Sequence, residues 1–283
     1  MGKAKWILLL LSTSAIFGLS YSLVKFSLSS FDTFALLAMR FLLASFLLGT
    51  YIVASNRRIG KNEAKYGLAI GLFLFLSYST QVYGLNFTSA THSSFISGLS
   101  AVMVPVLSAI LFLKSPANRK WIATLIAVFG LYVMLGVSGA FNVGDALTLL
   151  SALATSLEII YDSKAVKRCD LACLLFAQVA TVTVLSLVAT VFLRKIPSGY
   201  PLPALGAVVF LAVFTTVLSY FAQLMAQKTL EPTDVSLIYL TKPVFAVLFA
   251  FFMFGEALSV SEYAGAAIIL VGTYIGESGG NKK

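Results

Sequence analysis

Apolar stretches of about 20 residues follow one another along almost the whole chain, separated by short polar connections. A helix needs about 20 residues to cross a bilayer at a rise of 1.5 Å per residue. Lipid offers no partners to backbone N–H and C=O groups, so each spanning stretch is expected to be helical. The sequence therefore predicts an all-α membrane protein with ten transmembrane helices. The ten stretches are 6–24, 34–54, 64–85, 93–113, 121–138, 146–163, 171–193, 203–227, 235–254 and 260–276.

The composition excludes a soluble protein. Of the 283 residues, 59% are hydrophobic and only 11% are charged, and the mean hydropathy is +0.94. A soluble domain carries about twice that share of charged residues. The spans leave no room for an enzymatic or nucleic-acid-binding domain, so the lipid bilayer and a small molecule are the expected partners and nucleic acid is not.

The net charge of +9 is explained by topology. With the N-terminus in the cytoplasm, fifteen lysines and arginines fall in inside segments, and only Lys25, Arg194 and Lys195 fall outside. Arg40 and Lys242 lie within spans. Because inside loops carry an excess of Lys and Arg, both termini are expected in the cytoplasm, and the protein is expected in the cell's inner or plasma membrane.

The second half of the sequence repeats the first. At an offset of 142 residues the matches keep register without a gap: Leu76–Gln81 with Leu218–Gln223, Thr91–Ile96 with Thr233–Ile238, and Gly130–Tyr132 with Gly272–Tyr274. We therefore expect two five-helix repeats, residues 1–141 and 142–283. An odd number of spans inverts the second repeat, and inverted repeats are typical of secondary transporters whose binding site lies at the membrane midplane.

The offset is not uniform along the chain. The first and sixth spans align better at 138 to 139, which pairs Arg40 with Gln178. Pro105 in the fourth span and Pro243 in the ninth also differ by 138, which displaces them by about one turn in the 142 register. Proline kinks a helix, so these two residues are expected to mark gates at slightly different depths.

Lys242 lies in the middle of an apolar stretch. An amine at bilayer depth costs roughly 2.5 to 3.5 kcal/mol, so Lys242 is expected to face a protein-lined or watered cavity with an anionic partner. That partner is either the substrate or Glu158, which would form a structural ion pair with it. Pro243 removes one intrahelical N–H bond beside the lysine and leaves backbone carbonyls free to meet a ligand or water.

Three further charged or titratable residues are candidates. Glu158 lies inside the sixth span, where burial favours the protonated form; it either carries a coupling proton or pairs with Lys242. Arg40 either contacts the substrate or extends to the outer interface. His92 stands at a helix start and is a second candidate for proton coupling, with a solvated helix end as the alternative.

Tyrosine and glutamine residues complete the candidate cavity. Tyr78 with Gln81 and Tyr220 with Gln223 recur at the same spacing in the two repeats, and Tyr239 precedes Lys242 by one turn. Such side chains donate and accept hydrogen bonds while the ring keeps the wall apolar, which suits a polar metabolite. Hydrogen bonds between helices are the alternative role.

The motifs in their order resemble the EamA-type repeat of the drug/metabolite transporter superfamily over essentially the whole chain. The matching residues are Leu240, Pro243–Val244, Gly255–Glu256, Gly265, Ile268–Gly272 and Arg40–Ala44. The resemblance implies ten helices, with the first, third, fourth, sixth, eighth and ninth around a central cavity. Within the superfamily the sugar-phosphate branch meets phosphate partly through a lysine on the ninth helix, a place comparable to that of Lys242. The first repeat departs from the motif with Lys114 and Ala123 in place of its Glu and Gly.

The function that these patterns favour is a secondary transporter that exports a small polar metabolite with an anionic group, an amino acid or similar, by alternating access. No Gly-rich phosphate loop is present, so an ion gradient, with protons as the candidate ion, or a substrate gradient drives any active transport. A sugar-phosphate-type exchanger is the alternative, followed by a channel or structural component. The lone histidine lies across the membrane from Cys169 and Cys173, so neither a metal site, a cofactor nor an enzymatic activity is expected.

Overall fold

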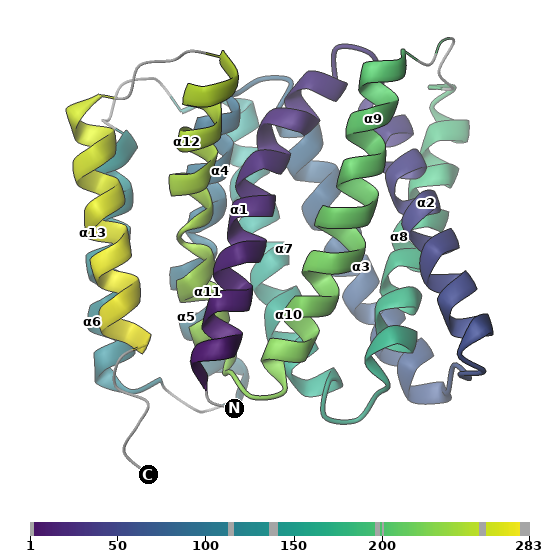
Figure 1. Ribbon diagram of the computed structural model, residues 1–283, viewed down its shortest axis with the longest axis horizontal. Coiled ribbons are helices and arrows are strands. Elements are labelled where there is room, and N and C mark those ends of the chain that lie inside the picture. Colours follow the sequence, from purple (N-terminus) through teal and green to yellow (C-terminus); the bar gives the residue numbers. More distant parts are fainter. Residues whose placement is uncertain are drawn as a thin grey trace.

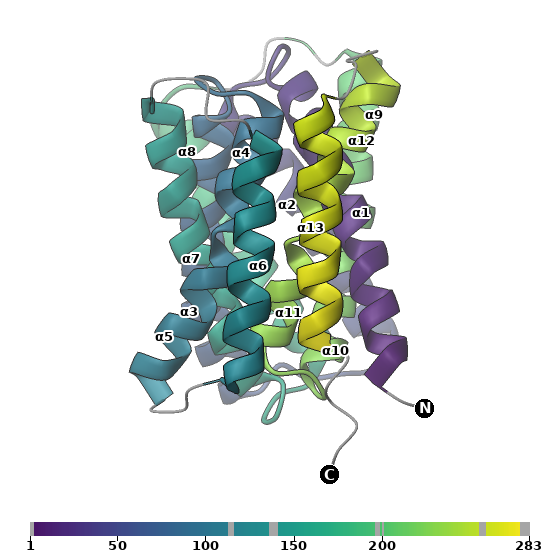
Figure 2. The ribbon, with the colours of Figure 1, turned by 90° about the vertical axis from the view of Figure 1, so that its left-hand side faces the viewer.

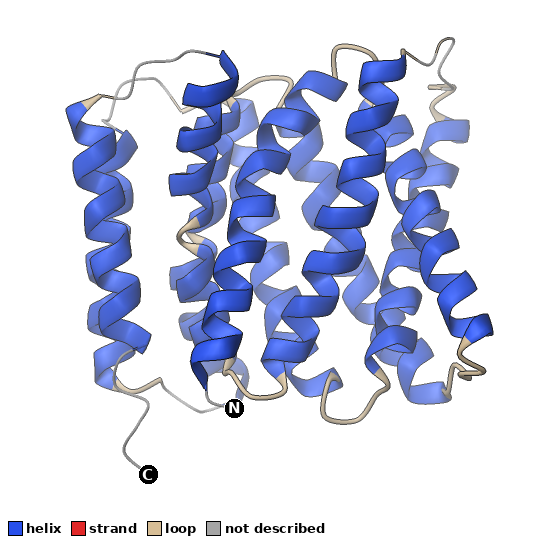
Figure 3. Ribbon diagram, viewed as in Figure 1, coloured by secondary structure: helices blue, strands red, loops and turns tan. Residues whose placement is uncertain are grey.

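A computed structural model describes residues 3–112, 116–135, 141–195, 199, 201–254 and 259–277. Every regular element in these ranges is helical, as Figure 3 shows, which confirms the all-α prediction. Lys114, Gly255 and Glu256, which belong to the family resemblance, lie outside the described residues.

The described helices line up end to end into ten rods. They are α1 (Lys3–Ser27), α2 (Thr33–Ala54), α3 (Lys61–Gly84), α4 (Ala90–Gly98) with α5 (Ser100–Phe112), α6 (Asn118–Leu135), α7 (Val143–Ala165), α8 (Leu171–Phe192), α9 (Leu202–Phe210) with the π-helix η1 (Leu211–Leu218) and α10 (Ser219–Gln227), α11 (Pro232–Tyr239) with α12 (Lys242–Phe254), and α13 (Val260–Glu277).

Eight of the rods in the described part of the chain are long and apolar enough to cross a membrane, all except α6 and α13. The protein is therefore a multi-pass membrane protein. That all ten rods cross the bilayer stays a prediction.

Both described ends of the chain lie at the same end of the bundle, as Figure 1 shows. The ammonium of Lys3 is 2.9 Å from a carboxylate oxygen of Glu277. We call this end of the bundle the terminal end and the opposite one the far end. Successive rods alternate in direction, so α7 starts at the far end, near the end of α3, and α8 starts at the terminal end.

The contacts between rods are similar when each rod is replaced by its counterpart from the other half of the chain. Helices α6 and α13 form a pair at one edge of the bundle, and α2 and α8 pack together at the other (Figures 1 and 2). In the middle, α3 packs on α7 as α10 packs on α1, and α4–α5 pack on α7 as α11–α12 pack on α1. Each contact within this set therefore has a counterpart in which the rods of the two halves change places.

Glycines allow the closest of these approaches. A Cβ atom added to Gly71 in α3 would lie 2.9 Å from the carbonyl oxygen of Gln178 in α8. One added to Gly272 in α13 would lie 2.8 Å from the backbone nitrogen of Ala127 in α6. Small residues let helix backbones meet in this way, and van der Waals contact then holds the rods together where lipid gives no hydrophobic driving force.

The fourth and ninth rods are each interrupted halfway. The break in the fourth rod lies at Leu99, and that in the ninth lies at Leu240 and Thr241. At both breaks the backbone N–H bonds to the carbonyl three residues back, from Leu99 to Ile96 and from Thr241 to Ile238. Leu99 and Thr241 are 142 residues apart, so the breaks occupy equivalent positions in the two repeats.

The two prolines lie differently with respect to these breaks. Pro243 is the second residue of α12 and follows its break directly, as the sequence suggested, since it lacks the N–H that would continue the ladder. Pro105 lies inside α5, and the break in its rod lies on the N-terminal side at Leu99. The interruptions are thus at matching depths, whereas the prolines are not.

Candidate functional site

A small cavity lies in the centre of the bundle between the two halves of the chain. Its volume is about 50 Å³, and the first, second, third, fourth, sixth, eighth and ninth rods contribute to its wall. Six residues singled out in the sequence line it: Arg40, Tyr78, Gln81, Tyr220, Tyr239 and Lys242. None of the described lining residues is acidic. A cavity this small holds one or two waters, so a metabolite fits only after the rods move apart.

Arg40 forms the wall of the cavity on the side of α2. Its side chain is only 1% exposed, so it does not extend to the interface. Its Nε donates to Thr216 Oγ1 at 2.8 Å, and its Nη2 donates to Tyr78 OH at 3.0 Å. The guanidinium carbon lies 4.5 Å from the centre of the Tyr78 ring. These contacts orient the cation but leave its charge without a carboxylate among the described lining residues.

Lys242, at the start of α12, is the second cation in the cavity wall. Its ammonium lies 3.7 Å from the centre of the Tyr239 ring and 4.1 Å from that of Phe17. The Phe17 ring in turn meets Tyr220 and Tyr239 edge-on, at 5.7 and 5.6 Å. Aromatic faces stabilise a desolvated cation without neutralising it, so the ammonium stays available to an anion.

Gln81 closes the cavity from α3. Its Nε2 donates to Ser97 Oγ at 2.9 Å and to Tyr21 OH at 3.4 Å. The wall therefore holds several hydroxyl and amide groups beside its two cations.

Gln223 lies just behind the wall and connects the cavity to a second cluster. Its Oε1 accepts from Tyr239 OH at 2.9 Å. Its Nε2 donates to Glu158 Oε1 at 2.8 Å and to Asp162 Oδ2 at 3.4 Å. Glu158 and Asp162 lie one helical turn apart on α7, are 1% and 0% exposed, and interact directly with each other. Gln178 in α8 donates to the other oxygen of Asp162 at 2.6 Å.

No ion pair joins Lys242 to Glu158 among the described residues, although the two charges attract each other. Their connection runs through the Tyr239 ring and the Gln223 amide. The carboxylate of Glu158, one of the two anionic partners predicted for Lys242, is therefore not paired with its ammonium group in this structure.

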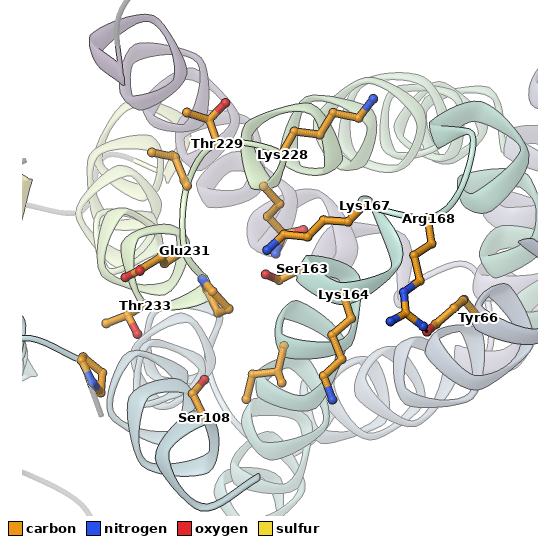
Figure 4. A pocket seen from close by; sticks show the side chains of 15 residues that line it. Tyr66, Ser108, Ser163, Lys164, Lys167, Arg168, Lys228, Thr229, Glu231 and Thr233 are labelled. Atoms are coloured by element: carbon orange, nitrogen blue, oxygen red, sulfur yellow. The ribbon is translucent and has the colours of Figure 1, made fainter. Parts of the chain in front are cut away.

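A much larger pocket opens at the terminal end, with a volume of about 750 Å³ (Figure 4). We call it the vestibule. It lies between the end of α7 and the turn from α10 to α11, with Tyr66 and Ser108 on its sides. Its charged lining residues are Lys164, Lys167, Arg168, Lys228 and Glu231, so the wall is basic overall.

At the far end, side-chain contacts hold together the described ends of α1, α3, α4 and α7, and we call these contacts the far-end closure. Lys25, near the end of α1, donates to the backbone carbonyls of Leu85 and Thr88 in the turn from α3 to α4, the latter at 2.9 Å. Thr88 Oγ1 donates to Asp145 Oδ1 at 2.9 Å, and His92 Nδ1 lies 3.4 Å from the same oxygen. His92 thus belongs to the far-end closure and lies outside the lining of the central cavity.

An ion-pair cluster fastens the terminal end beside the vestibule. Asp234 at the start of α11 lies 2.8 Å from Lys120 and 3.7 Å from Lys3, and Lys120 also binds Glu231. Burial lowers the pKa of Lys120, but the Asp234 and Glu231 carboxylates raise this pKa by more, so it ends above its ordinary value. The cluster joins α1, α6, α11 and α13 through permanent charges.

The sequence did not identify several residues of these sites. Asp162 was missed, although a carboxyl group one turn after Glu158 on an apolar helix was a usable signal. Phe17 and Tyr21 were missed because aromatic residues in an apolar span carry no distinguishing pattern. Within the described residues, no group of three His, Cys, Asp or Glu is close enough to hold a metal ion.

Comparison with known families identifies the same architecture twice. The model of the EamA-like transporter family matches residues 4–136 and again residues 142–276. An uncharacterized transporter of Archaeoglobus fulgidus is 29% identical over 92% of this chain and 82% of its own length. The S-adenosylmethionine uptake transporter of Rickettsia prowazekii is 24% identical over 95% of this chain and 90% of its own length.

One solved crystal structure superimposes on the fold with a TM-score of 0.80 at 16% sequence identity. The match covers 98% of this chain and 99% of the other. A likeness at this identity supports the fold alone.

Proposed function

The chain belongs to the EamA-like transporter family, and from this premise we propose a secondary transporter that exports a small polar metabolite with an anionic group, such as an amino acid, by alternating access. Membership in the family makes the protein a membrane transporter. The substrate, the direction and the site are our proposal.

The observation that carries the substrate class is the pair of cations in the central cavity. Arg40 comes from the first half of the chain and Lys242 from the second, and both line the same buried space without an acidic neighbour in the described lining. A buried cation without a permanent counter-ion is costly, and an anionic ligand relieves that cost. Tyr78, Tyr220 and Tyr239 add apolar faces and hydroxyl groups for the rest of the metabolite.

The relative named for S-adenosylmethionine uptake fits this chemistry only in part. S-adenosylmethionine carries an α-carboxylate, which the two cations suit, but its sulfonium and α-ammonium groups make it a net cation, which two buried cations disfavour. That protein is named for uptake, so the direction of transport by this chain has to be measured separately.

Two inverted repeats, 1–141 and 142–283, would supply the moving parts. The family model matches each half separately, the helix breaks lie 142 residues apart, and the packing of the rods is consistent with an exchange of the halves. Rocking of one repeat against the other would then open the cavity alternately at the two ends. The basic loops favour a cytoplasmic terminal end in the plasma or inner membrane.

We take protons as the coupling ion, with Glu158 as the candidate carrier. His92 is the second candidate, but its place in the far-end closure suits a gate better than a path to the cavity. No cofactor is part of the proposal.

Transport in proteoliposomes tests it. The purified chain is reconstituted and given a panel of amino acids, S-adenosylmethionine and sugar phosphates, with uptake and efflux followed by radiolabel. We expect an anionic or zwitterionic metabolite to be transported.

Lys242→Met should fold and insert normally but lose about 10-fold in affinity for every 1.4 kcal/mol of lost pairing. Lys242→Arg should be intermediate, because a planar fork replaces a compact ammonium.

The structural role of Lys242 predicts the opposite. If the lysine only neutralises Glu158, then Lys242→Met leaves a buried carboxylate without its counter-charge and lowers the melting temperature. The double change with Glu158→Gln then restores stability and transport together. Transport at wild-type level by this double variant would refute substrate contact by Lys242.

The vestibule favours a second candidate, a sugar-phosphate-type exchanger. Its four basic residues, Lys164, Lys167, Arg168 and Lys228, would attract a dianion more strongly than a zwitterion. Strict counter-exchange of phosphate esters, with no net efflux, would establish this alternative.

A further inference from the structure

We propose that Glu158 and Asp162 together form a proton-binding site that holds a single proton between two carboxyl groups, with Asp162 as its second member. This inference rests on the proposed transport function and names its coupling site. It assigns a role to Asp162, a residue that the sequence did not single out.

Geometry supports a shared proton. The two carboxyl groups lie one turn apart on α7, interact directly and share the amide nitrogen of Gln223 at 2.8 and 3.4 Å. Both are 1% exposed or less. Two negative charges that interact directly and are both buried are costly together, so one carboxyl group is expected to keep its proton.

An unsatisfied oxygen on Gln178 is the second observation. Gln178 is wholly buried, and its Nε2 is 2.6 Å from Asp162 Oδ1, but its Oε1 has no hydrogen-bond partner. A buried polar atom left unpaired is costly. Rotation of the amide by half a turn presents Oε1 to Asp162, where a protonated carboxyl group would donate to it.

The donors around the pair favour a proton over a metal cation. The amide nitrogen of Gln223 points at an oxygen of each carboxyl group, and an N–H group repels a cation such as Na⁺. The bond from Tyr239 OH to Gln223 Oε1 fixes this orientation of the amide. The titratable groups that act on the pair from neighbouring helices are Lys242, Tyr239 and Tyr220. The single positive charge of Lys242 is balanced by one negative charge on the Glu158–Asp162 pair, so a second ionised carboxyl group is not needed.

The pair communicates with the substrate cavity through one side chain. Gln223 donates to the carboxyl pair through Nε2 and accepts from Tyr239 OH through Oε1, and the Tyr239 ring lies against Lys242. A change of protonation therefore alters what Gln223 offers to the cavity wall. Binding of an anion at Lys242 changes the electrostatic field at the pair, so substrate occupancy and proton occupancy are expected to affect each other.

Infrared spectroscopy of the purified protein tests the site without a substrate. A buried, protonated carboxyl group gives a C=O stretching band separate from those of carboxylates. We expect this band in the wild-type protein at pH 7, its loss in both Glu158→Gln and Asp162→Asn, and no change in the exposed-residue control Glu231→Gln. Each amide variant removes the second acidic group, whose charge favours the shared proton. The remaining group keeps its amide donors, Gln223 for Glu158 and both Gln178 and Gln223 for Asp162, so it should ionise.

Three results would overturn the proposal. A wild-type protein without the band has no shared proton. A band that survives one of the two variants places the proton on a single residue. Loss of the band on adding NaCl, but not choline chloride, at constant pH shows a cation site instead. The wild-type measurements stand even if a variant fails to fold, and the band is independent of transport, so the failure of one proposal is distinguishable from that of the other.

A second inference rests on the two ends of the bundle. We infer that Lys167 is the lysine that closes the vestibule when the terminal end shuts, by binding the backbone carbonyls of Gln227 and Leu230. At the far end Lys25 binds the carbonyls of Leu85 and Thr88. An offset of 142 takes these three residues to Lys167, Gln227 and Leu230.

All three counterparts line the vestibule, where the corresponding contact is open. Lys167 is exposed, and Figure 4 shows its side chain extending into the pocket. In the register of the first and sixth spans Lys25 corresponds to Lys164 instead, but that side chain lies over the Tyr161 ring. The same lysine-to-carbonyl contact would therefore be formed at one end while it is broken at the other.

Cysteine labelling tests this latch. Ser163→Cys places a thiol in the vestibule of a chain in which Cys169 and Cys173 are replaced, and a membrane-impermeant maleimide measures how often the vestibule is open. Lys25→Met should slow labelling at least twofold, because the far end loses its latch and the terminal end closes more often. Adding Lys167→Met should restore the rate, whereas adding Lys164→Met as the matched control should not.

An unchanged rate in Lys25→Met, or a double variant with Lys167→Met that stays protected, would contradict the latch. Restoration of the labelling rate by Lys164→Met would assign the contact to Lys164 instead of Lys167 and refute the inference. Lys25→Gln serves as the second variant if Lys25→Met does not fold, and thermal melting of each protein checks this.

Discussion

The far end and the terminal end of the bundle contain equivalent residues in different states. At the far end Lys25 holds the turn from α3 to α4, and Asp145 at the start of α7 meets His92 at the start of the fourth rod. At the terminal end the equivalent turn stands away from Lys167 across a space of about 750 Å³. In the register of the offset 142, the lysine-to-carbonyl contact is formed at the far end and open at the terminal end.

At the offset of 142, Asp145 pairs with Lys3 and His92 pairs with Asp234, which places an acid opposite a base in both comparisons. At the offset of 138 to 139, which suits the first and sixth spans better, Asp145 pairs with Trp6 or Ile7. The terminal-end pair consists of permanent charges reinforced by Lys120, Glu231 and Glu277, whereas the far-end pair contains an imidazole. The two ends therefore hold their turns with different chemistry, and we expect them to be unequal in strength.

The largest expected effect is in the reporter signal that shows which side of the membrane each end of the bundle faces. Reporters fused after Lys120 and after Lys283 should read as cytoplasmic, and one inserted near Gly144 should read as external. The basis is the excess of fifteen basic residues to three in the alternate connections. A cytoplasmic signal at Gly144 would place both ends on one side and remove the inverted-repeat argument.

Much of the architecture could be predicted because it depends on local sequence. The length and hydropathy of each stretch determine a spanning helix, and the helical ranges agree with the ten predicted stretches to within a few residues. Six candidate residues reach one cavity because a polar side chain in an apolar span has few other places to go.

Depth and partners could not be predicted, because they depend on how each helix is rotated and what packs against it. From the sequence, Arg40 could extend either to the membrane interface or into the cavity. Only its contacts with Thr216 and Tyr78 place it in the cavity wall. The link from Glu158 to Lys242 through Gln223 and Tyr239 involves three rods and has no pattern in the chain. The contact of Lys25 with backbone carbonyls is invisible in a sequence, because carbonyls belong to every residue.

Removal of one acid from each end should reveal their unequal strength. Asp234→Asn leaves Lys3 beside Glu277 and Lys120 beside Glu231 but removes the carboxylate that both lysines face in a largely buried cluster. The lost charge-assisted bonds should cost roughly 3 kcal/mol of unfolding free energy. Asp145→Asn keeps a capping oxygen and loses mainly charge-assisted bonds to Thr88 and His92, for about 1 kcal/mol. Thermal melting should therefore show a fall about three times larger for Asp234→Asn.

Equal falls in melting temperature would contradict the assigned difference between the ends. Asp32→Asn, a change at a more exposed helix cap, is the matched control and should shift melting less than either.

The smallest expected effect concerns the cavity between the two ends, where the halves contribute different groups at equivalent positions. Arg40 corresponds to Gln178 at an offset of 138, yet Arg40 is a cation in the cavity wall and Gln178 is an amide on the carboxyl pair. Arg40→Gln therefore makes the two repeats alike at this position.

We expect Arg40→Gln to fold, because removing an intramembrane charge relieves its desolvation cost, and to bind the transported metabolite about 10-fold more weakly, for about 1.4 kcal/mol of lost pairing. Arg40→Lys should recover only part of the affinity, since the bonds to Thr216 and Tyr78 use two nitrogens of a planar guanidinium at once. Arg194→Gln makes the same change at an exposed far-end position and should leave affinity unaltered. Equilibrium binding of the metabolite found in the uptake panel gives all three values. Wild-type affinity in Arg40→Gln would show that the cavity binds its anion through Lys242 alone, and the two halves would then differ in function as well as in chemistry.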